Sequence, residues 1–182
     1  MESAKRLKTK KIIEEAMVKL LREESFDQIT TVKLTKEAGI SRSSFYTHYR
    51  DKYDMIERYQ QVLFHQLEYI FDKHHKTPQP QETIKEVFEF LEREPLLAAL
   101  LSENGTKEIQ SFFRNKFQQL IAKDLQFRIL GEPFNEIERD YAAIYLTNAC
   151  FGVTQTWLTR GRHEKPEMLA NFLLKMFGIS HP

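Results

Sequence analysis

The side chains best suited to chemistry in this chain are the polar ones between residues 41 and 48. Hydroxyl, guanidinium and imidazole groups surround a single Phe in the run Ser41-Arg42-Ser43-Ser44-Phe45-Tyr46-Thr47-His48. Groups of this kind form hydrogen bonds with the base edges and phosphates of DNA. A helix over this segment would turn most of them outward, and a short polar helix fits the major groove of B-DNA. The segment therefore predicts a DNA-reading element rather than a catalytic centre.

Two short helices separated by a tight turn are needed to hold that segment against DNA. The sequence predicts the first over residues 32–38, with Thr31 as its N-cap, and the second over 42–48, with Ser41 as its N-cap. Gly39 stands in the turn between them, where a left-handed backbone is expected. The residues expected to pack the two helices together are Leu34, Ala38, Ile40 and Phe45. This is the pattern of a helix-turn-helix.

The rest of the chain is also predicted to be helical, because apolar residues recur at spacings of three and four and never alternate over a strand-length window. Further helices are expected at about 7–24, 52–75, 82–93, 96–101, 107–130, 136–159 and 166–177. The predicted fold class is all-α, with an N-terminal three-helix helix-turn-helix DNA-binding domain at residues 1–52. A helical C-terminal domain is expected at 53–182. The helix at 52–75 links the two domains, and residues 73–81 form the only clear linker.

Charge is distributed unevenly along the chain, although the formal net charge is only +1. Residues 1–60 carry thirteen Lys and Arg against ten Asp and Glu, whereas residues 61–182 carry fourteen against sixteen. Five of the basic residues precede the first apolar stripe, namely Lys5, Arg6, Lys8, Lys10 and Lys11. Positive potential is therefore expected beside the proposed reading helix. A basic stretch of this kind is more often a solvated arm.

Several classes of site are not indicated by the sequence. The single cysteine, Cys150, excludes an intramolecular disulfide and argues against a Cys-based zinc site. The histidines show no second ligand at metal-binding spacing, so no metal is expected. No nucleophile–base pair, glycine-rich phosphate loop or pair of acids stands out either. We therefore expect no cofactor and no enzyme activity.

Nothing in the sequence predicts export or membrane insertion. The basic residues at the N-terminus are not followed by an apolar segment of the kind that a secretory signal needs. The longest apolar run, at residues 96–101, is far shorter than the roughly 20 residues that span a bilayer. A cytoplasmic location with no membrane partner is expected.

Four short motifs carry a resemblance that covers about residues 8–56. They are Phe26-x-x-Ile29-Thr30-Thr31, Ala38-Gly39-Ile40-Ser41-Arg42, Phe45-Tyr46-x-His48-Tyr49 and Asp51-Lys52-Tyr53. With the helix before them, they resemble the DNA-binding domain of the TetR family of bacterial transcriptional regulators. A further motif, Ala149-x-x-Gly152-x-x-x-x-Trp157-Leu158-x-x-Gly161, is similar to a C-terminal subtype of that family related to regulators of dihydroxyacetone kinase. The resemblance implies a C-terminal domain that binds an effector and dimerises through the last two helices.

Base readout is expected from the helix at 42–48. Arg42 is the best candidate, since a guanidinium can bond a guanine edge through two hydrogen bonds. A phosphate contact from Arg42 is an equal alternative. Ser43, Ser44 and Thr47 are expected to contact bases or thymine methyl groups, although Ser43 or Ser44 can instead face the protein.

Phosphate contacts are expected from the ends of the helices. Tyr46 and His48 resemble the phosphate-contacting pair of the family, and a His48 packed on the first helix is the alternative. Thr31 and Lys52 stand at helix starts, where free N–H groups and the positive helix end favour phosphate. With Ser41, these residues complete the predicted DNA-binding set.

Two residues depart from the pattern of the family. Thr35 stands where a small Ala is usual, so looser packing between the two short helices is expected. Val32 stands where some members have a polar or basic residue, which makes base contacts from the first of these helices doubtful.

Aromatic and polar side chains of the C-terminal domain are candidates for an effector cavity. Those selected are Phe113, Phe117, Tyr141, Tyr145, Asn148 and Trp157. Aromatic residues at helical spacing more often form ordinary core. The polar residues of helix 136–159 can instead lie in a dimer interface.

The expected function is that of a homodimeric, sequence-specific transcriptional regulator that binds a double-stranded DNA operator and acts as a repressor. Two copies of the reading helix would enter successive major grooves. A small-molecule effector in the C-terminal domain would release the DNA, and linkage then requires DNA to weaken effector binding equally. One alternative is a co-regulator whose C-terminal domain binds a partner protein. The other is a helical enzyme with an incidental helix-turn-helix, which lacks a catalytic constellation in the sequence.

Overall fold

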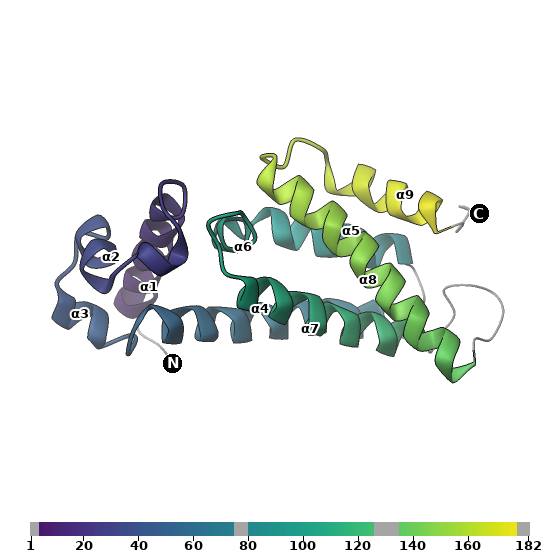
Figure 1. Ribbon diagram of the computed structural model, residues 1–182, viewed down its shortest axis with the longest axis horizontal. Helices are drawn as coiled ribbons and strands as arrows, with labels where there is room; N and C mark the ends of the chain where they lie inside the picture. Colours follow the sequence, from purple (N-terminus) through teal and green to yellow (C-terminus); the bar gives the residue numbers. More distant parts are fainter. Residues whose placement is uncertain (1–3, 75–79, 126–134, 178–182) are drawn as a thin grey trace.

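The computed structural model of the protein describes residues 4–74, 80–125 and 135–177, among which there are helices and no strands (Figure 1). The predicted all-α fold class is confirmed. In chain order the elements are α1 (Ala4–Leu20), the 3-10 turn η1 (Phe26–Gln28), α2 (Thr31–Glu37), α3 (Arg42–Tyr46), α4 (Lys52–His74), α5 (Pro80–Glu92), α6 (Pro95–Leu100), α7 (Lys107–Leu125), α8 (Glu136–Thr159) and α9 (Pro166–Met176). None of the described helices is both long and apolar enough to cross a membrane.

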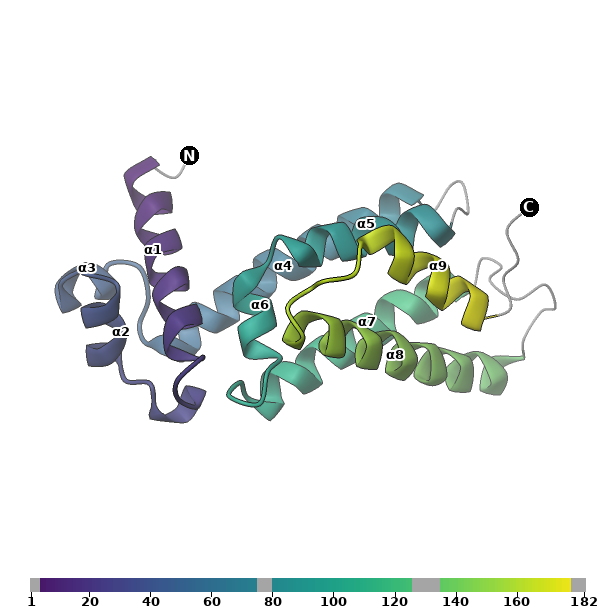
Figure 2. The ribbon, with the colours of Figure 1, turned by 90° about the horizontal axis from the view of Figure 1, so that it is seen from above.

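The three helices α1, α2 and α3 form a head at one end of the molecule, and α4 leads from this head into the other helices (Figure 1). Seen from above, α5 to α9 form a body, and α6 stands at the end of this body nearest to α1 (Figure 2). Contacts between α1 and α6 join the head directly to the body. The head is therefore held both through α4 and through the region of α6.

The head has a closed apolar core. Ile13 and Met17 of α1 are fully buried together with Phe26 of η1, Leu34 of α2 and Phe45 of α3. Burying each such side chain contributes about 1.5–3 kcal/mol, which is the main source of stability for a domain of this size. Because these residues face inward, most of the polar residues between them along α2 and α3 are turned outward, with Thr35 as a buried exception.

The linking helix α4 begins at a side-chain cap and continues with one apolar face. The Asp51 carboxylate accepts a hydrogen bond of 2.8 Å from the Asp54 N–H, which satisfies one free donor of the first turn. Farther along, Leu63, Leu67 and Ile70 are buried at helical spacing. The start of α4 therefore contacts the head, and its apolar face packs against α5 and α7 of the body.

The body consists of paired helices, with α5 packed on α9 and α7 packed on α8. Pro95 and Pro166 occupy the first positions of α6 and α9, where a missing N–H costs nothing. The longest helix, α8, starts with a capping box in which Asn135 and Glu138 bond each other's backbone N–H groups. A further hydrogen bond of 2.9 Å, from the Tyr59 hydroxyl of α4 to Glu94, ties α4 to the start of α6.

Most of the predicted helix bounds agree with the structure to within a few residues, and those of α8 agree fully. Two boundaries differ. The first helix ends at Leu20 rather than near residue 24, because the backbone turns over residues 21–25. The prediction that Thr31 caps α2 is wrong: Thr30 is the N-cap, and its hydroxyl accepts a hydrogen bond of 3.2 Å from the Lys33 N–H. The predicted end of the helix at 107–130 and most of the linker at 73–81 lie outside the described residues.

Candidate nucleic-acid interface and internal cavity

The turn between α2 and α3 has the geometry expected of a helix-turn-helix. Gly39 has a φ of +64°, a left-handed conformation that an L side chain adopts only with strain. Ser41 has an extended backbone, and its hydroxyl accepts a hydrogen bond of 3.0 Å from the Ser44 N–H. The predicted N-cap of α3 is therefore confirmed. This cap and the Gly39 turn set the direction in which α3 leaves the head.

Thr35 is a buried polar residue of α2. Its side chain is buried, and its hydroxyl donates a hydrogen bond of 3.1 Å to the Val32 carbonyl one turn earlier. The polar group is satisfied within its own helix, so it needs no partner across the interface. The hydroxyl of Thr35 is therefore satisfied, and the looser packing expected between α2 and α3 stays a prediction. Val32 itself is exposed and presents no polar group to a ligand.

The outer face of α3 carries most of the predicted base-reading groups. Arg42, Ser43 and Thr47 are exposed, and Ser44 is half-buried. The Thr47 hydroxyl donates to the Ser44 carbonyl at 2.7 Å, which leaves its methyl group and an oxygen lone pair free for a ligand. This face can bond base edges through hydroxyls and a guanidinium, as direct readout in a major groove requires.

The residues predicted to contact phosphate differ in their exposure to solvent. Tyr46 is half exposed, at 50% of its full accessibility, and its ring meets Phe45 edge-on with centroids 5.7 Å apart. Thr31 is half-buried at the start of α2. His48, by contrast, is only 8% exposed and lies beside the buried ring of Tyr49. The packed alternative therefore describes His48 better than the phosphate contact.

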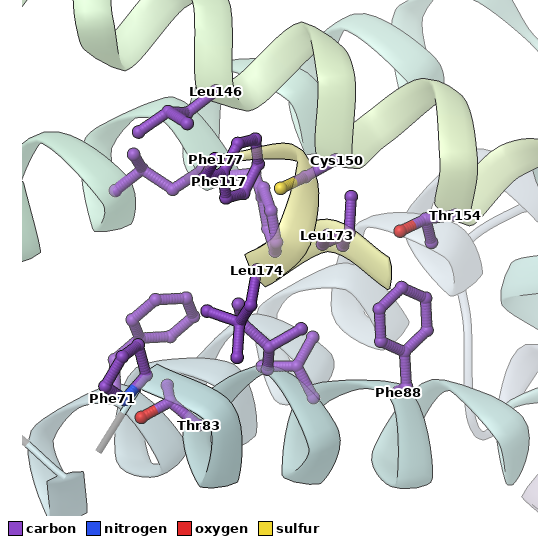
Figure 3. Close-up of a pocket in the computed structure, with 14 residues that line it drawn as sticks. Phe71, Thr83, Phe88, Phe117, Leu146, Cys150, Thr154, Leu173, Leu174 and Phe177 are labelled. Carbon is purple, nitrogen blue, oxygen red and sulfur yellow. The ribbon is translucent and has the colours of Figure 1, made fainter. Parts of the chain in front are cut away.

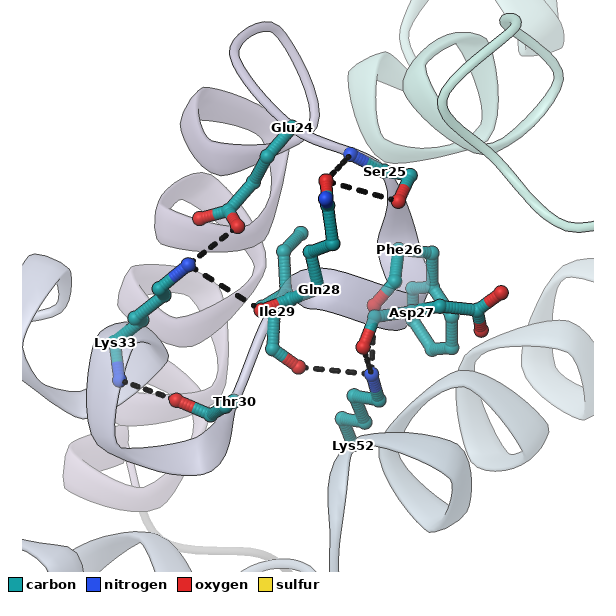
Figure 4. Close-up of polar contacts among 9 residues, drawn as sticks. All are labelled: Glu24, Ser25, Phe26, Asp27, Gln28, Ile29, Thr30, Lys33 and Lys52. Atoms are coloured by element: carbon teal, nitrogen blue, oxygen red, sulfur yellow. Dashed lines mark hydrogen bonds and ion pairs between the residues drawn. The ribbon is translucent and has the colours of Figure 1, made fainter.

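Lys52 is the clearest correction to the predicted interface. Its ammonium nitrogen is buried and donates to three backbone carbonyls, those of Phe26 at 2.6 Å, Ile29 at 2.8 Å and Asp27 at 3.1 Å (Figure 4). It also lies 4.6 Å from the centroid of the Phe26 ring. Burial lowers the pKa of Lys52 below its usual value, while the charges of Asp27 and Glu24 oppose that shift. A group held in this way braces η1 against α4 and has no donor left for DNA.

An ionic network fixes the start of α4 beneath α3. The buried Asp54 carboxylate accepts hydrogen bonds from the Arg50 N–H at 2.9 Å and from the Arg58 guanidinium at 3.1 Å. The backbone hydrogen bond from Arg50 is the main reason why the pKa of Asp54 is lowered, and Arg58 adds to it. The residues that join α3 to α4 are thereby held in one conformation.

An apolar cavity of about 70 Å³ lies inside the body (Figure 3). Side chains from five helices line it, and the polar groups among them are the hydroxyls of Thr83 and Thr154 and the thiol of Cys150. Burial raises the pKa of Cys150 to about 12, so the thiol stays neutral. The other lining residues include Phe71, Phe88, Phe117, Leu146, Leu173, Leu174 and Phe177. In the described part of the chain, no group of three His, Cys, Asp or Glu side chains is placed to hold a metal ion.

Only Phe117 of the six predicted ligand-binding residues lines this cavity. Tyr141 and Tyr145 are 69% and 64% exposed on the outer face of α8, and Phe113 is buried in the core away from the cavity. The Asn148 side chain donates to the Ile144 carbonyl at 2.8 Å, within its own helix. Trp157 stacks edge-on against Phe88 and donates to the Glu164 carbonyl. Five of the six predicted residues therefore do not line this cavity.

The lining residues that the sequence did not single out come from several helices. Thr83 and Phe88 come from α5, and Leu173 and Leu174 come from α9 (Figure 3). Their only signal in the sequence is apolar periodicity, which every core residue shares. The packing of α5 on α9, which selects them, is not encoded locally.

A stripe of large apolar side chains is exposed along α8 and α9. On α8 the stripe contains Ile137, Tyr141, Ile144 and Tyr145, and on α9 it contains Met168, Phe172 and Met176. Spacings of three and four place each set on one face of its helix. Each of the two helices therefore presents an outward apolar stripe, and we call the two stripes together the α8–α9 face.

Comparisons with known proteins support both parts of this architecture. Residues 8–59 match a family model described as bacterial regulatory proteins of the tetR family. Residues 78–178 match a model described as a transcriptional regulator C-terminal region. Among curated proteins, the chain is 23% identical over 166 residues to YxbF of Bacillus subtilis, an uncharacterized HTH-type transcriptional regulator. That alignment covers 87% of this chain but 42% of YxbF, so the chain spans less than half the length of this relative.

Solved structures share the fold over nearly the whole chain. DhaS, a dihydroxyacetone kinase operon activator, superposes with a TM-score of 0.62 at 17% identity over 93% of both chains. The transcriptional regulator FadR of Bacillus subtilis, solved in complex with stearoyl-CoA, has a TM-score of 0.64 at 18% identity over 93% of this chain and 98% of its own. The arrangement of head and body is thus that of known helix-turn-helix regulators.

Proposed function

The chain belongs to the TetR family of bacterial transcriptional regulators, and from this premise we propose that it is a homodimeric repressor released from its operator by an apolar small molecule. Binding of DNA by a helix-turn-helix regulator follows from the family. The homodimer, the direction of regulation, the effector, the individual contacts and a cytoplasmic location belong to the proposal. Repression requires only that the bound protein occupy an operator near the promoter, whereas activation, as in DhaS, requires a further productive contact.

The exposed face of α3 is the observation that carries the DNA-binding part of the proposal. Arg42, Ser43, Thr47 and Tyr46 project from a helix whose opposite side, at Phe45, is locked into the core. We assign base readout to Arg42 and Thr47 and phosphate contact to Tyr46. In a dimer, two such helices would enter major grooves one helical turn apart, about 34–36 Å from centre to centre.

Replacing Arg42 with alanine should weaken binding to the cognate operator by about 5- to 150-fold, the cost of one lost bidentate base contact. Binding to random DNA should fall much less, because it depends on phosphate charges. Fluorescence anisotropy with labelled cognate and random duplexes at one salt concentration measures both. The operator can be obtained by selecting bound sequences from random DNA.

Lys36→Ala is the matched control for this experiment, because it removes one exposed positive charge from the head without changing α3. We expect it to weaken both duplexes by similar small factors. Equal losses on cognate and random DNA for Arg42→Ala would assign this arginine to the phosphate backbone.

The cavity favours the proposal that the body binds a small-molecule effector over the alternative that it binds a partner protein. Its lining is almost entirely aliphatic and aromatic, with the Thr83 and Thr154 hydroxyls as polar groups. An uncharged apolar molecule with one hydrogen-bonding group suits such a lining, because a buried charge would remain unpaired. At about 70 Å³ the cavity is smaller than the roughly 300–1,000 Å³ of typical ligand sites, so an effector must widen it. That widening is a means of moving the helices around it.

We expect n-decanol, an uncharged apolar probe, to raise the melting temperature of the protein and to lower its operator affinity by about fivefold or more, a typical size for coupling between sites. Cys150→Phe, which places a ring in the cavity, should abolish both effects. Differential scanning fluorimetry and anisotropy measure them. In a reporter strain, decanol should then raise expression from the operator if the protein represses.

Thr156→Phe is the control, since it adds the same ring to an exposed site on α8 outside the cavity. It should leave the response to decanol unchanged. A response that survives in Cys150→Phe, or that is lost in both variants, would reject the cavity as the effector site. A fall in reporter expression on adding decanol would reverse the assigned direction of regulation.

A further inference from the structure

The loop between α6 and α7 reaches from the body into the head at Asn104. Its side-chain amide donates a hydrogen bond of 2.8 Å to the Leu21 carbonyl, at the end of α1. Its backbone carbonyl accepts a hydrogen bond of 2.7 Å from the Phe26 N–H, at the start of η1. One residue of the body thus bonds both ends of the turn that joins α1 to η1.

These two bonds satisfy groups that the head leaves unpartnered in its own secondary structure. The last carbonyls of a helix accept no hydrogen bond within that helix. Leu21, whose carbonyl binds Asn104, is the first residue after α1. The Phe26 N–H begins a new turn and has no preceding helix to bond. Because Asn104 supplies both partners, the turn at residues 21–26 is set against the body and not by the head alone.

The same short segment is braced from its other side by α4. The Phe26 and Ile29 carbonyls accept hydrogen bonds from Lys52 (Figure 4). The Phe26 N–H donates to the Asn104 carbonyl. Directly after Ile29, Thr30 caps α2 and so leads into the helix-turn-helix. The position of η1 relative to the body is therefore passed on to α2 and α3 within a few residues.

The loop that carries Asn104 is itself tightly built. The Ser102 hydroxyl donates to the Ala99 carbonyl at 2.6 Å, and the Gly105 N–H donates to the Ser102 carbonyl at 3.1 Å. A Cβ at Gly105 would lie 1.7 Å from the Leu100 carbonyl oxygen, so only glycine fits this close approach. If α6 changes position, this tightly bonded loop should move with it and carry Asn104 along.

The loop is also attached to a helix that lines the cavity. Gln155 of α8 donates a hydrogen bond of 2.8 Å to the Leu101 carbonyl, at the end of α6. Its neighbour Thr154 lines the cavity. Short stretches of backbone and the hydrogen bonds of Gln155 and Asn104 therefore connect the cavity wall, through the α6–α7 loop, to the head.

We propose that Asn104 is a positioning residue for operator binding, which sets the angle of the head on the body through the α6–α7 loop. This inference rests on the proposed dimeric binding of paired half-sites. In a dimer the head angle determines the distance between the two reading helices, and that distance must match the spacing of the half-sites. Without the Asn104 side chain, each head gains freedom to tilt, and the dimer discriminates less between spacings.

The test compares operators whose half-sites stand at the selected spacing and at one and two base pairs more or less. Wild-type affinity should fall steeply as the spacing departs from the selected one. For Asn104→Ala we expect affinity for the selected operator to fall by about fivefold or more while the off-spacing operators lose less. Asn104→Asp, which keeps the size but cannot donate to the Leu21 carbonyl, should behave in the same way.

Gln110→Ala is the matched control, because it also removes an amide donor, to the Ser102 carbonyl at 3.4 Å, but this contact stays within the body. Its spacing profile should match that of the wild type. Thermal melts show whether each variant is folded under the binding conditions. Equal losses at every spacing for Asn104→Ala, or an unchanged profile, would overturn the positioning role. A wild-type protein insensitive to spacing would instead overturn the dimeric operator binding on which the inference rests.

Discussion

Replacing Lys52 with methionine should lower the free energy of unfolding by about 2–4 kcal/mol, although this residue carries a charge and lies in the DNA-binding head. Methionine can fill the space of the lysine stem but cannot donate a hydrogen bond. The three carbonyls that now bind the ammonium, those of Phe26, Asp27 and Ile29, would lose that donor. An unsatisfied buried carbonyl costs about 1–3 kcal/mol, and relief of the buried charge offsets part of the sum.

Urea unfolding followed by circular dichroism measures this loss. Lys33→Met is the control, because Lys33 is also a lysine of the head with a carboxylate partner, Glu24, but is exposed to solvent. Surface changes of this kind usually alter stability by no more than about 0.5 kcal/mol. A loss for Lys52→Met as small as that for Lys33→Met would contradict the structural role of the three bonds.

The salt dependence of DNA binding tests whether Lys52 has a structural role or contacts a DNA phosphate. Loss of a phosphate-binding lysine reduces the slope of log affinity against log salt by about one. We expect the folded fraction of Lys52→Met to keep the wild-type slope, because the ammonium is buried. A reduced slope would show that Lys52 leaves its carbonyl partners to bind DNA.

A glutamate at Phe172 should convert the protein to a monomer and weaken operator binding by about 100-fold or more. Phe172 lies in the middle of the apolar stripe of α9, and we propose that a second copy of the α8–α9 face covers it. A carboxylate there would be buried without a partner in the dimer. A monomer binds only one half-site and loses the effective concentration that linkage of two sites provides, typically worth 10²–10⁴ in affinity.

Sedimentation velocity gives the oligomeric state, and anisotropy with the full operator and a single half-site gives the affinities. Tyr69→Glu is the control, because Tyr69 is also an exposed aromatic residue but lies on α4, outside the α8–α9 face. It should leave the dimer intact. Affinity for a single half-site should not change in Phe172→Glu. A dimer that persists in Phe172→Glu, or that is lost in Tyr69→Glu, would place the interface elsewhere.

The features predicted most closely from the sequence are those that neighbouring residues determine. Ser41 caps α3 because its own hydroxyl meets the N–H of Ser44, and Gly39 turns the chain because it has no side chain. The bounds of α8 were predicted for the same reason, since Asn135, which caps it, and the end at Thr159 lie in its own stretch of chain. Each of these features needs no more than about four residues of sequence.

The misplaced residues are those whose roles depend on a distant partner. Tyr141 and Tyr145 share helix α8 with the cavity-lining Cys150, yet they point away from the cavity because α5, α7 and α9 cover only the other side. Periodicity shows that a helix has two faces, but not which apolar face meets the core when both carry large side chains. The sequence left two alternatives open for His48, a phosphate contact and a packed side chain, for the same reason.

By itself, the sequence determined that the protein is a helical regulator with a DNA-reading helix at its N-terminal end, because caps, turns and apolar spacing are properties of neighbouring residues. Tertiary structure alone decided that Lys52 is a brace, that the cavity lies between α5, α8 and α9, and that Asn104 joins body to head. Lys52 meets carbonyls that lie 23 to 26 residues earlier, and Asn104 meets one 83 residues earlier. Contacts at such separations exist only once the helices have packed, since packing selects which side chain meets which backbone group.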